Sequence, residues 1–270
     1  MVDRVSTGIS EFDAMVDGGF PRGSTVLLTG QPGTGKSIFA LQFICNGIKQ
    51  GENGIYIYAE SHVDSLKAQA KEMGFDLEQL QRDGKLILIN IPLVKKKFDI
   101  LYAVQEARDR IDAKRVVFDS LATFAVNLDL FTIPQAYSGN VASSVTVGSK
   151  TDEMYKAWDE DKAPKDNQEK KVIYSHQKRL IYLIIETLRG LGTTNLLITF
   201  SGDNNRISTD GISEFIADGI VVFYNELIGS KHIRTMTILK MRTTDHSTHI
   251  HDFKIEDDGI KISSEEEVYK

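Results

Sequence analysis

A glycine-rich motif near the N-terminus constrains this chain more than any other feature of its sequence. Residues 30–37 read GQPGTGKS, which fits the pattern G-x-x-x-x-G-K-[S/T], and they lie between a β-rich run at Thr25–Thr29 and an amphipathic run at 37–49. A strand, this loop and a helix in succession form the arrangement that binds nucleotide phosphates. The motif therefore predicts a phosphate-binding loop in an α/β fold, and it disfavours a plain glycine-rich turn.

The residue types in the motif suit phosphate chemistry. Glycines let the chain curl so that backbone N–H groups and the helix N-terminus point at the β-phosphate. Lys36 brings a positive charge near the γ-phosphate, and Ser37 offers a hydroxyl oxygen to Mg²⁺. The predicted nucleotide-binding residues of this segment are Gln31, Pro32, Gly33, Thr34, Gly35, Lys36, Ser37 and Ile38.

Two acidic residues end expected strands, where they could serve the metal and the attacking water. Asp119 ends a buried apolar run, and the Mg²⁺ site of phosphate-loop proteins needs an acid in that position. Glu60 ends the strand expected after the loop's helix, where a general base would reach the γ-phosphate side. Capping of the following helix is the alternative role for Glu60. We predict Ser37 and Asp119 as metal ligands, and Lys36 and Glu60 as catalytic residues.

The remaining pattern predicts a mostly parallel sheet flanked by helices, with an antiparallel extension at the C-terminal end. Strand-like and helix-like runs alternate up to Leu197, as in parallel strands joined by helical crossovers. Short runs with tight connections follow, which favours antiparallel pairing. The expected strands are 25–29, 55–59, 86–91, 115–118, 195–200, 219–224, 234–240, 250–255 and 259–262, and the main helices are 37–49, one that begins at a capping box at Ser61 and runs through Met73, 99–112 and 172–191.

Length, charge and hydropathy limit the other possibilities. The 270 residues suit one enlarged domain with an insertion at about 126–171, whose second half is densely charged. A net charge of −6 opposes the broad cationic surface of a duplex-binding protein. No apolar run approaches the roughly 18–20 residues of a membrane span, and the first residues do not resemble a signal peptide. We expect a cytoplasmic protein without a membrane partner.

Three segments in this order resemble the KaiC family within the RecA-like ATPases. Residues 5–13 and 18–24 lead into the phosphate loop as they do in members of that family. Residues 238–242 read ILKMR and are followed by Thr244 and His246, which is similar to the family's Lys-x-Arg stretch. The resemblance therefore rests on motif order as well as on the phosphate loop.

The resemblance covers about residues 1–125 and 172–262 and implies a RecA-like phosphate-loop fold that binds and hydrolyses ATP with Mg²⁺. In this family the Lys-x-Arg stretch reaches the nucleotide of a neighbouring subunit. That implies catalytic roles in trans for Lys240 and Arg242, and a nucleotide contact for His246. A cation from the next subunit stabilises charge that develops on the γ-phosphate. The resemblance thus implies a homo-oligomer, with a hexameric ring expected, that acts on an unidentified protein partner in signalling or regulation.

The sequence departs from the family pattern at three places. Glu60 is followed by Ser61, where many members carry a second acid, so we expect slow turnover. Thr243 replaces the glycine that usually follows Lys-x-Arg, and the 126–171 segment is longer than expected at that point.

Three alternative functions stay open at the level of sequence. The first is an autokinase, although Glu214 and Phe215 align with the Ser-Thr pair that clock proteins of this family phosphorylate. The second is a slow nucleotide switch in which ATP orders the 126–171 insertion for docking on a partner. The third is a recombinase-like DNA-binding ATPase, which the acidic charge disfavours.

Overall fold

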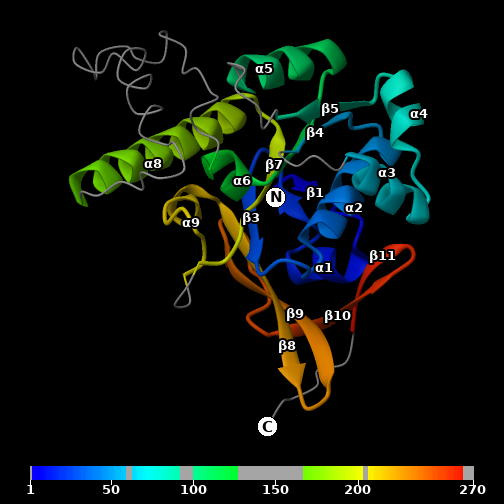
Figure 1. Ribbon diagram of the computed structural model, residues 1–270. Coiled ribbons are helices and arrows are strands. Elements are labelled where there is room, and N and C mark those ends of the chain that lie inside the picture. The colour runs from blue at the N-terminus through cyan, green and yellow to red at the C-terminus, as the bar shows by residue number, and fades with distance from the viewer. Residues whose placement is uncertain (1, 59–62, 92–99, 127–166, 203–205, 264–270) are drawn as a thin grey trace.

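The structure of this chain is a computed structural model that describes residues 2–58, 63–91, 100–126, 167–202 and 206–263. Within these residues, nine strands form one sheet in the order β11-β10-β9-β8-β3-β7-β6-β4-β5 (Figure 1). Those strands are β3 Thr25–Gly30, β4 Gly54–Tyr58, β5 Leu86–Asn90, β6 Arg115–Asp119, β7 Thr194–Ile198, β8 Gly219–Ile228, β9 Lys231–Met241, β10 His251–Glu256 and β11 Gly259–Ile262. A separate short pair joins β1 Arg4–Val5 to β2 Phe20–Pro21.

The direction of the strands divides the sheet into two parts. From β5 to β8 in the sheet order every pair of neighbouring strands is parallel, whereas β8, β9, β10 and β11 pair antiparallel in succession. The predicted α/β architecture, with its antiparallel C-terminal extension, is therefore confirmed. β3 lies in the middle of the sheet and all six of its residues are buried, as expected for a strand covered on both faces.

Helices cover both faces of the sheet and create two apolar cores. One core packs around α2 Lys36–Lys49 and the helices α1 Ser10–Met15, α3 Val63–Glu72 and α4 Leu77–Arg82. The other packs around α5 Ile100–Ile111, α6 Leu121–Val126, α8 Asn167–Gly190 and the short α9 Ser213–Ile216. The phosphate-loop helix α2 is thus held on one face and α8 on the other (Figure 1).

The elements that differ from the expected ones are mainly the short ones. The structure adds β1, β2, α1, α4, α6 and α9, which have no counterpart in the expected elements because each is very short and shows little periodicity. β8 and β9 extend beyond 219–224 and 234–240 into a hairpin whose tip carries exposed residues. Residues 127–166 of the expected insertion lie outside the described residues, and the remainder of its C-terminal part belongs to α8.

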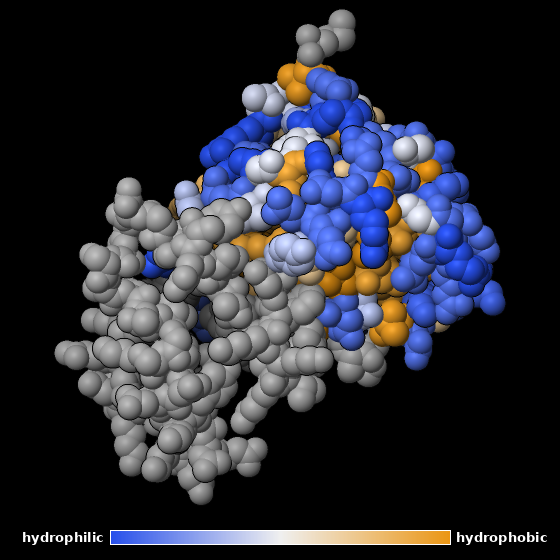
Figure 2. All heavy atoms as spheres, turned by 90° about the horizontal axis from the view of Figure 1, so that it is seen from above, coloured by the Kyte–Doolittle hydropathy of each residue, from blue (hydrophilic) through white to orange (hydrophobic). Residues whose placement is uncertain are grey.

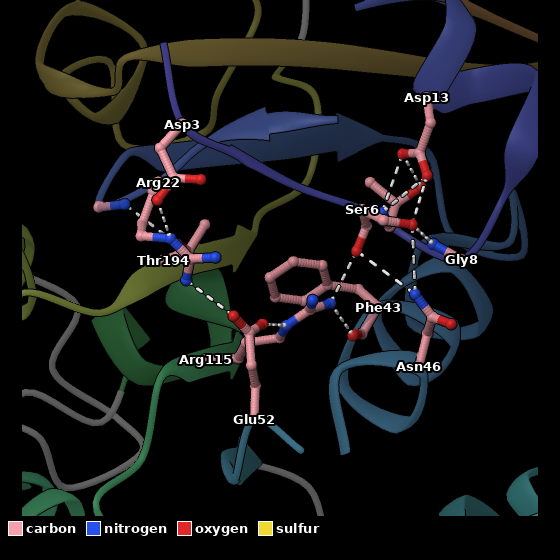
Figure 3. Close-up of polar contacts among 12 residues, drawn as sticks. Asp3, Ser6, Gly8, Asp13, Arg22, Phe43, Asn46, Glu52, Arg115 and Thr194 are labelled. Atoms are coloured by element: carbon pink, nitrogen blue, oxygen red, sulfur yellow. Dashed lines mark hydrogen bonds and ion pairs between the residues drawn. The ribbon is translucent and has the colours of Figure 1, made fainter. Parts of the chain in front are cut away.

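A charged network around the buried Arg115 ties the N-terminal segment to the C-terminal half of α2 (Figure 3). Arg115 at the start of β6 is fully buried and pairs through Nε with Glu52 Oε2 at 2.7 Å, and Glu52 Oε1 pairs with Arg22 at 2.7 Å. Arg115 Nη1 donates to the carbonyls of Ser6 and Phe43 at 2.8 and 2.7 Å. One side chain therefore joins β6, the N-terminal segment and α2.

The described helices are all too short or too polar to cross a membrane. From above, hydrophilic residues dominate the coloured surface and the hydrophobic areas between them are small (Figure 2).

Candidate functional site

The glycine-rich loop lies at the carboxyl end of the central strand β3. Gly30 has a φ of 142°, and a Cβ at this position would collide with the carbonyl oxygen of Phe223 on β8. Gly35 has a φ of 99°, and a Cβ there would lie 2.9 Å from Ile255 Cδ1 on β10. Both positions require glycine because φ is positive and the neighbouring strands approach closely. The loop is therefore shaped by β8 and β10, which both lie on the same side of β3 in the sheet.

The first turn of α2 presents an uncapped, positive helix end inside this loop. Gly35 is the N-cap residue, no side chain caps it, and the first turn contains no acidic residue. The N–H groups at the start of a helix need a partner, and their dipole favours an anion. The loop and helix start thus have the geometry of a phosphate site.

Lys36 is held inside the loop by its own backbone. Its Nζ donates to the carbonyls of Gly30 and Gln31, each at 2.8 Å, and contacts Thr34 Oγ1 at 3.3 Å. Phe200 covers the ammonium at 5.1 Å from its ring centroid, which is a cation–π distance. Burial lowers the pKa of Lys36 to about 8, although the negative charge of Asp119 acts in the opposite direction. The site therefore holds a cation that is costly to keep charged without an anionic partner.

Ser37 and Asp119 meet beside Lys36. Ser37 Oγ donates to Asp119 Oδ2 at 2.8 Å, which brings the start of α2 and the end of β6 together. Tyr56 on β4 donates its hydroxyl to the same oxygen at 2.8 Å. The peptide bond after Asp119 is cis. A hydroxyl and a carboxylate at this spacing are the hard oxygen donors that Mg²⁺ prefers, and Mg²⁺ commonly uses only one or two of them from the protein.

The predicted trans-acting cations stand apart from this cluster, and the predicted base cannot be compared with it. Glu60 lies outside the described residues. Lys240 and Arg242 lie beside the amino end of β3, because Met241 pairs with Gly219 and Arg242 N donates to the carbonyl of Asp218. The phosphate loop leaves from the opposite, carboxyl end of β3, at Gly30. The two cations are therefore separated from the phosphate loop of their own chain by the length of that extended strand.

Lys240 and Arg242 are both bound to the segment that joins α9 to β8. Lys240 Nζ donates to the carbonyls of Ala217 at 2.6 Å and Glu214 at 3.4 Å. Arg242 Nη1 donates to Asp218 Oδ1 at 3.1 Å. Burial and the charge of Arg242 lower the pKa of Lys240. The structure thus brings these two predicted residues together around one short segment.

His246 and Thr243 complete the C-terminal stretch. His246 Nδ1 lies 3.0 Å from the carbonyl oxygen of Ser247, whose N–H donates to Met15 at the end of α1. Thr243 has a φ of 58°. This value lies in the left-handed region, which a β-branched residue rarely adopts. The glycine that the family resemblance leads us to expect at this position would adopt this conformation without strain.

Sequence reasoning missed several residues of the loop's surroundings. Phe253 and Ile255 of β10 lie against Gly35, Phe200 covers Lys36, and Tyr56 binds Asp119. Tyr56 carried a signal, since a tyrosine in a buried strand needs a partner for its hydroxyl. The contacts of β10 carried none, because that strand lies near the opposite end of the sequence from Gly35.

Comparisons with known proteins agree with the geometry of the loop. The family model of the KaiC ATPase matches residues 5–131 and 169–267. A UPF0273 protein of Aeropyrum pernix is 31% identical over 97% of this chain and 94% of its own length. The circadian clock oscillator protein KaiC of Acaryochloris marina is 28% identical over 97% of this chain, which spans 44% of that protein. A solved structure of a KaiC-like protein from Pyrococcus horikoshii matches with a TM-score of 0.71 at 29% identity, over 97% of this chain and 100% of that one.

Proposed function

The chain belongs to the KaiC family of ATPases, and from this premise we propose that it hydrolyses ATP to ADP and phosphate with Mg²⁺ at the interfaces of a homo-oligomer. The observation that carries the proposal is the 2.8 Å contact between Ser37 Oγ and Asp119 Oδ2, beside the buried ammonium of Lys36. A metal-binding pair and a phosphate-binding cation at one helix start are what nucleoside triphosphate hydrolysis requires.

The loop residues would bind the triphosphate. Residues 31–38 surround the start of α2, where backbone N–H groups and the helix dipole favour an anion. Lys36 would exchange its two carbonyl partners for phosphate oxygens. Because burial lowers the pKa of Lys36, the negative charge of the phosphate would stabilise the protonated ammonium. Phe253 and Ile255 would form an apolar wall next to the loop.

Ser37 and Asp119 would hold Mg²⁺. When bound, the ion supplies charge neutralisation at the β- and γ-phosphates. Tyr56 would keep Asp119 oriented through its hydroxyl. Glu60 stays our candidate for the base that orients the attacking water, on the strength of its place in the sequence.

Lys240, Arg242 and His246 would serve the nucleotide of a neighbouring subunit. The length of β3 between these cations and the loop of their own chain supports a role in trans, since both cations are bound near the amino end of that strand. A hexameric ring and a regulatory output to a protein partner complete the proposal.

Asp119→Asn tests the metal role. The substitution keeps the size of the side chain and removes its charge, so Mg²⁺-dependent phosphate release should fall by at least about 100-fold, as expected for loss of several kcal/mol of metal stabilisation. Phosphate release is measured across a Mg²⁺ titration, alongside binding of a fluorescent ATP analogue. Asp83→Asn, at an exposed carboxylate that accepts from Gln79, is the matched control and should hydrolyse ATP at the wild-type rate. Unchanged turnover in Asp119→Asn would remove Asp119 from the metal site.

A further inference from the structure

Asp218 makes contacts in three directions from the junction between α9 and β8. Its Oδ1 accepts from Arg242 Nη1 at 3.1 Å and from Arg189 Nη2 of α8 at 3.4 Å. Its Oδ2 accepts from the backbone N–H of Thr25 at 3.0 Å. The carboxylate is largely buried, with 19% of its side chain exposed, whereas 54% of the Arg242 side chain is exposed. A fixed anion thus holds a cation whose end reaches solvent.

The backbone fixes this anion firmly. Asp218 N donates to Thr25 O at 2.8 Å and Arg242 N donates to Asp218 O at 2.9 Å, so Asp218 is bonded on both sides to neighbouring strands. Arg189 strengthens the same junction by donating to the carbonyl of Ile216 at 2.9 Å. The position of the carboxylate therefore depends on the sheet, and the position of Arg242 depends on the carboxylate.

The charges around Asp218 leave positive charge available to an anion. Arg189 has a second acidic partner in Glu186. Lys240 is bound by backbone carbonyls, which carry no net charge. The negative charge of Asp218 acts on both Lys240 and Arg242, and it neutralises only one of their two charges. Its contact orients Arg242 without cancelling the positive field of the pair.

We propose that Asp218 is a positioning residue that holds Arg242 in place for the nucleotide of the neighbouring subunit. The inference rests on the proposed function, in which Arg242 acts in trans. A long, exposed arginine loses conformational entropy when it binds a phosphate, and an arginine already held in one orientation loses less. Asp218 touches no nucleotide in this scheme, and its effect on turnover passes through Arg242.

Mixed assemblies separate this role from a structural one. Lys36→Ala subunits supply intact cations, and Lys240→Ala/Arg242→Ala subunits supply intact phosphate loops. Each is expected to be inactive alone and the mixture active. Asp218→Asn is then added to one subunit type at a time. Asparagine keeps an oxygen for the Thr25 N–H and removes the charge that holds Arg242.

We expect Asp218→Asn to lower phosphate release by at least about tenfold only when it is in the Lys36→Ala subunits, because a misplaced catalytic group can reduce turnover by up to about 100-fold. In the other subunits it has no Arg242 to position, and activity should stay within about twofold. The decrease should fall on kcat rather than KM. Asp112→Asn, which removes an exposed ion pair with Lys114, is the control for both subunits.

Each possible result has a distinct meaning. An equal decrease from either subunit, or no decrease from both, overturns the positioning role of Asp218. An inactive starting mixture, formed from subunits that each co-assemble by native mass, overturns catalysis in trans and therefore the proposed function itself. Thermal melting of each subunit shows whether the Asp218 variant is folded.

Discussion

Lys36 shows how a single residue of the loop combines burial with charge. Its ammonium is enclosed by backbone carbonyls and by Phe200, so the folded chain binds its proton less tightly than an exposed lysine does. The pKa falls from 10.5 to about 8. Between these two values the unfolded chain holds more protons, so this group adds to folding stability as the pH rises through that window.

The same shift predicts a pH dependence of nucleotide binding. Phosphate oxygens stabilise the charged form, so above about pH 8 the chain must take up a proton when it binds ATP, and affinity should fall by up to about tenfold per pH unit. Calorimetry between about pH 7 and about pH 9.5, in buffers of different ionisation enthalpy, measures both affinity and proton uptake. Lys36→Arg stays protonated and should show neither effect. The same decline in both proteins would mean that Lys36 is not the titrating group.

Residue identities in the loop could be predicted from the sequence, but their partners could not. The motif located Lys36 and Ser37, and an acid after an apolar run located Asp119. Asp218 gave no such signal, because its partners Thr25 and Arg189 are distant in sequence. Thr243 departs from the expected family pattern, and only its positive φ shows what this departure means for the backbone.

Among the elements, α2 is held at both ends by different means. Its first turn contacts Asp119 through Ser37, and its other end packs against Arg115. At Gly47 a Cβ would collide with the Arg115 guanidinium, so the helix passes directly over this side chain. Burial lowers the pKa of Arg115, and the ion pair with Glu52 opposes that shift. The position of the loop helix therefore depends on a buried arginine at the far end.

Arg115→Ala should destabilise the fold by about 3–5 kcal/mol, because it removes a charged donor from the carbonyls of Ser6 and Phe43 and one partner of a buried ion pair. The free energy of unfolding comes from urea titration without nucleotide. The adjacent Lys114→Ala is the matched control, since its pair with Asp112 is exposed. That control should change stability by less than about 1 kcal/mol. Equal effects of the two substitutions would show that burial of Arg115 contributes nothing.

The elements that hydrophobic periodicity predicted are the long ones with a buried face. α2, α5 and the parallel strands were located closely, because each buries a regular apolar pattern. The hairpin of β8 and β9 was predicted too short, since its tip has no buried face. Arg115 could not be identified as buried, because a charged residue at a strand start usually faces solvent.

For the whole molecule, the RecA-like fold places complementary parts of the proposed active site at opposite ends of β3. One end holds the phosphate loop and the other holds Lys240 and Arg242. Two copies arranged head to tail would bring these ends together, and such heterologous contacts form a ring when the rotation between copies closes. The order of the strands along the chain could be predicted from the sequence, but this separation follows from the direction and register of β9, which runs antiparallel to β8 and pairs Met241 with Gly219.

Assembly should therefore depend on nucleotide. Native mass spectrometry should show an oligomer with ATP and Mg²⁺ and smaller species without them, because ATP contributes to the contact between subunits. Specific activity, measured as phosphate release, should rise with protein concentration. Lys36→Ala should show no nucleotide-dependent increase in mass. A monomer that hydrolyses ATP at the full rate would contradict the interface site.

The central position of β3 also governs the order in which the chain can fold. During synthesis β3 and the loop emerge early, but both neighbours of that strand, β7 and β8, belong to the last third of the sequence. Pairing over such a separation is slow, and it leaves an apolar strand without partners on the ribosome. The nascent chain thus carries its phosphate-binding motif long before β8 and β10 are made and can pack against it. We expect the chain to bind nucleotide only after these strands have joined the sheet.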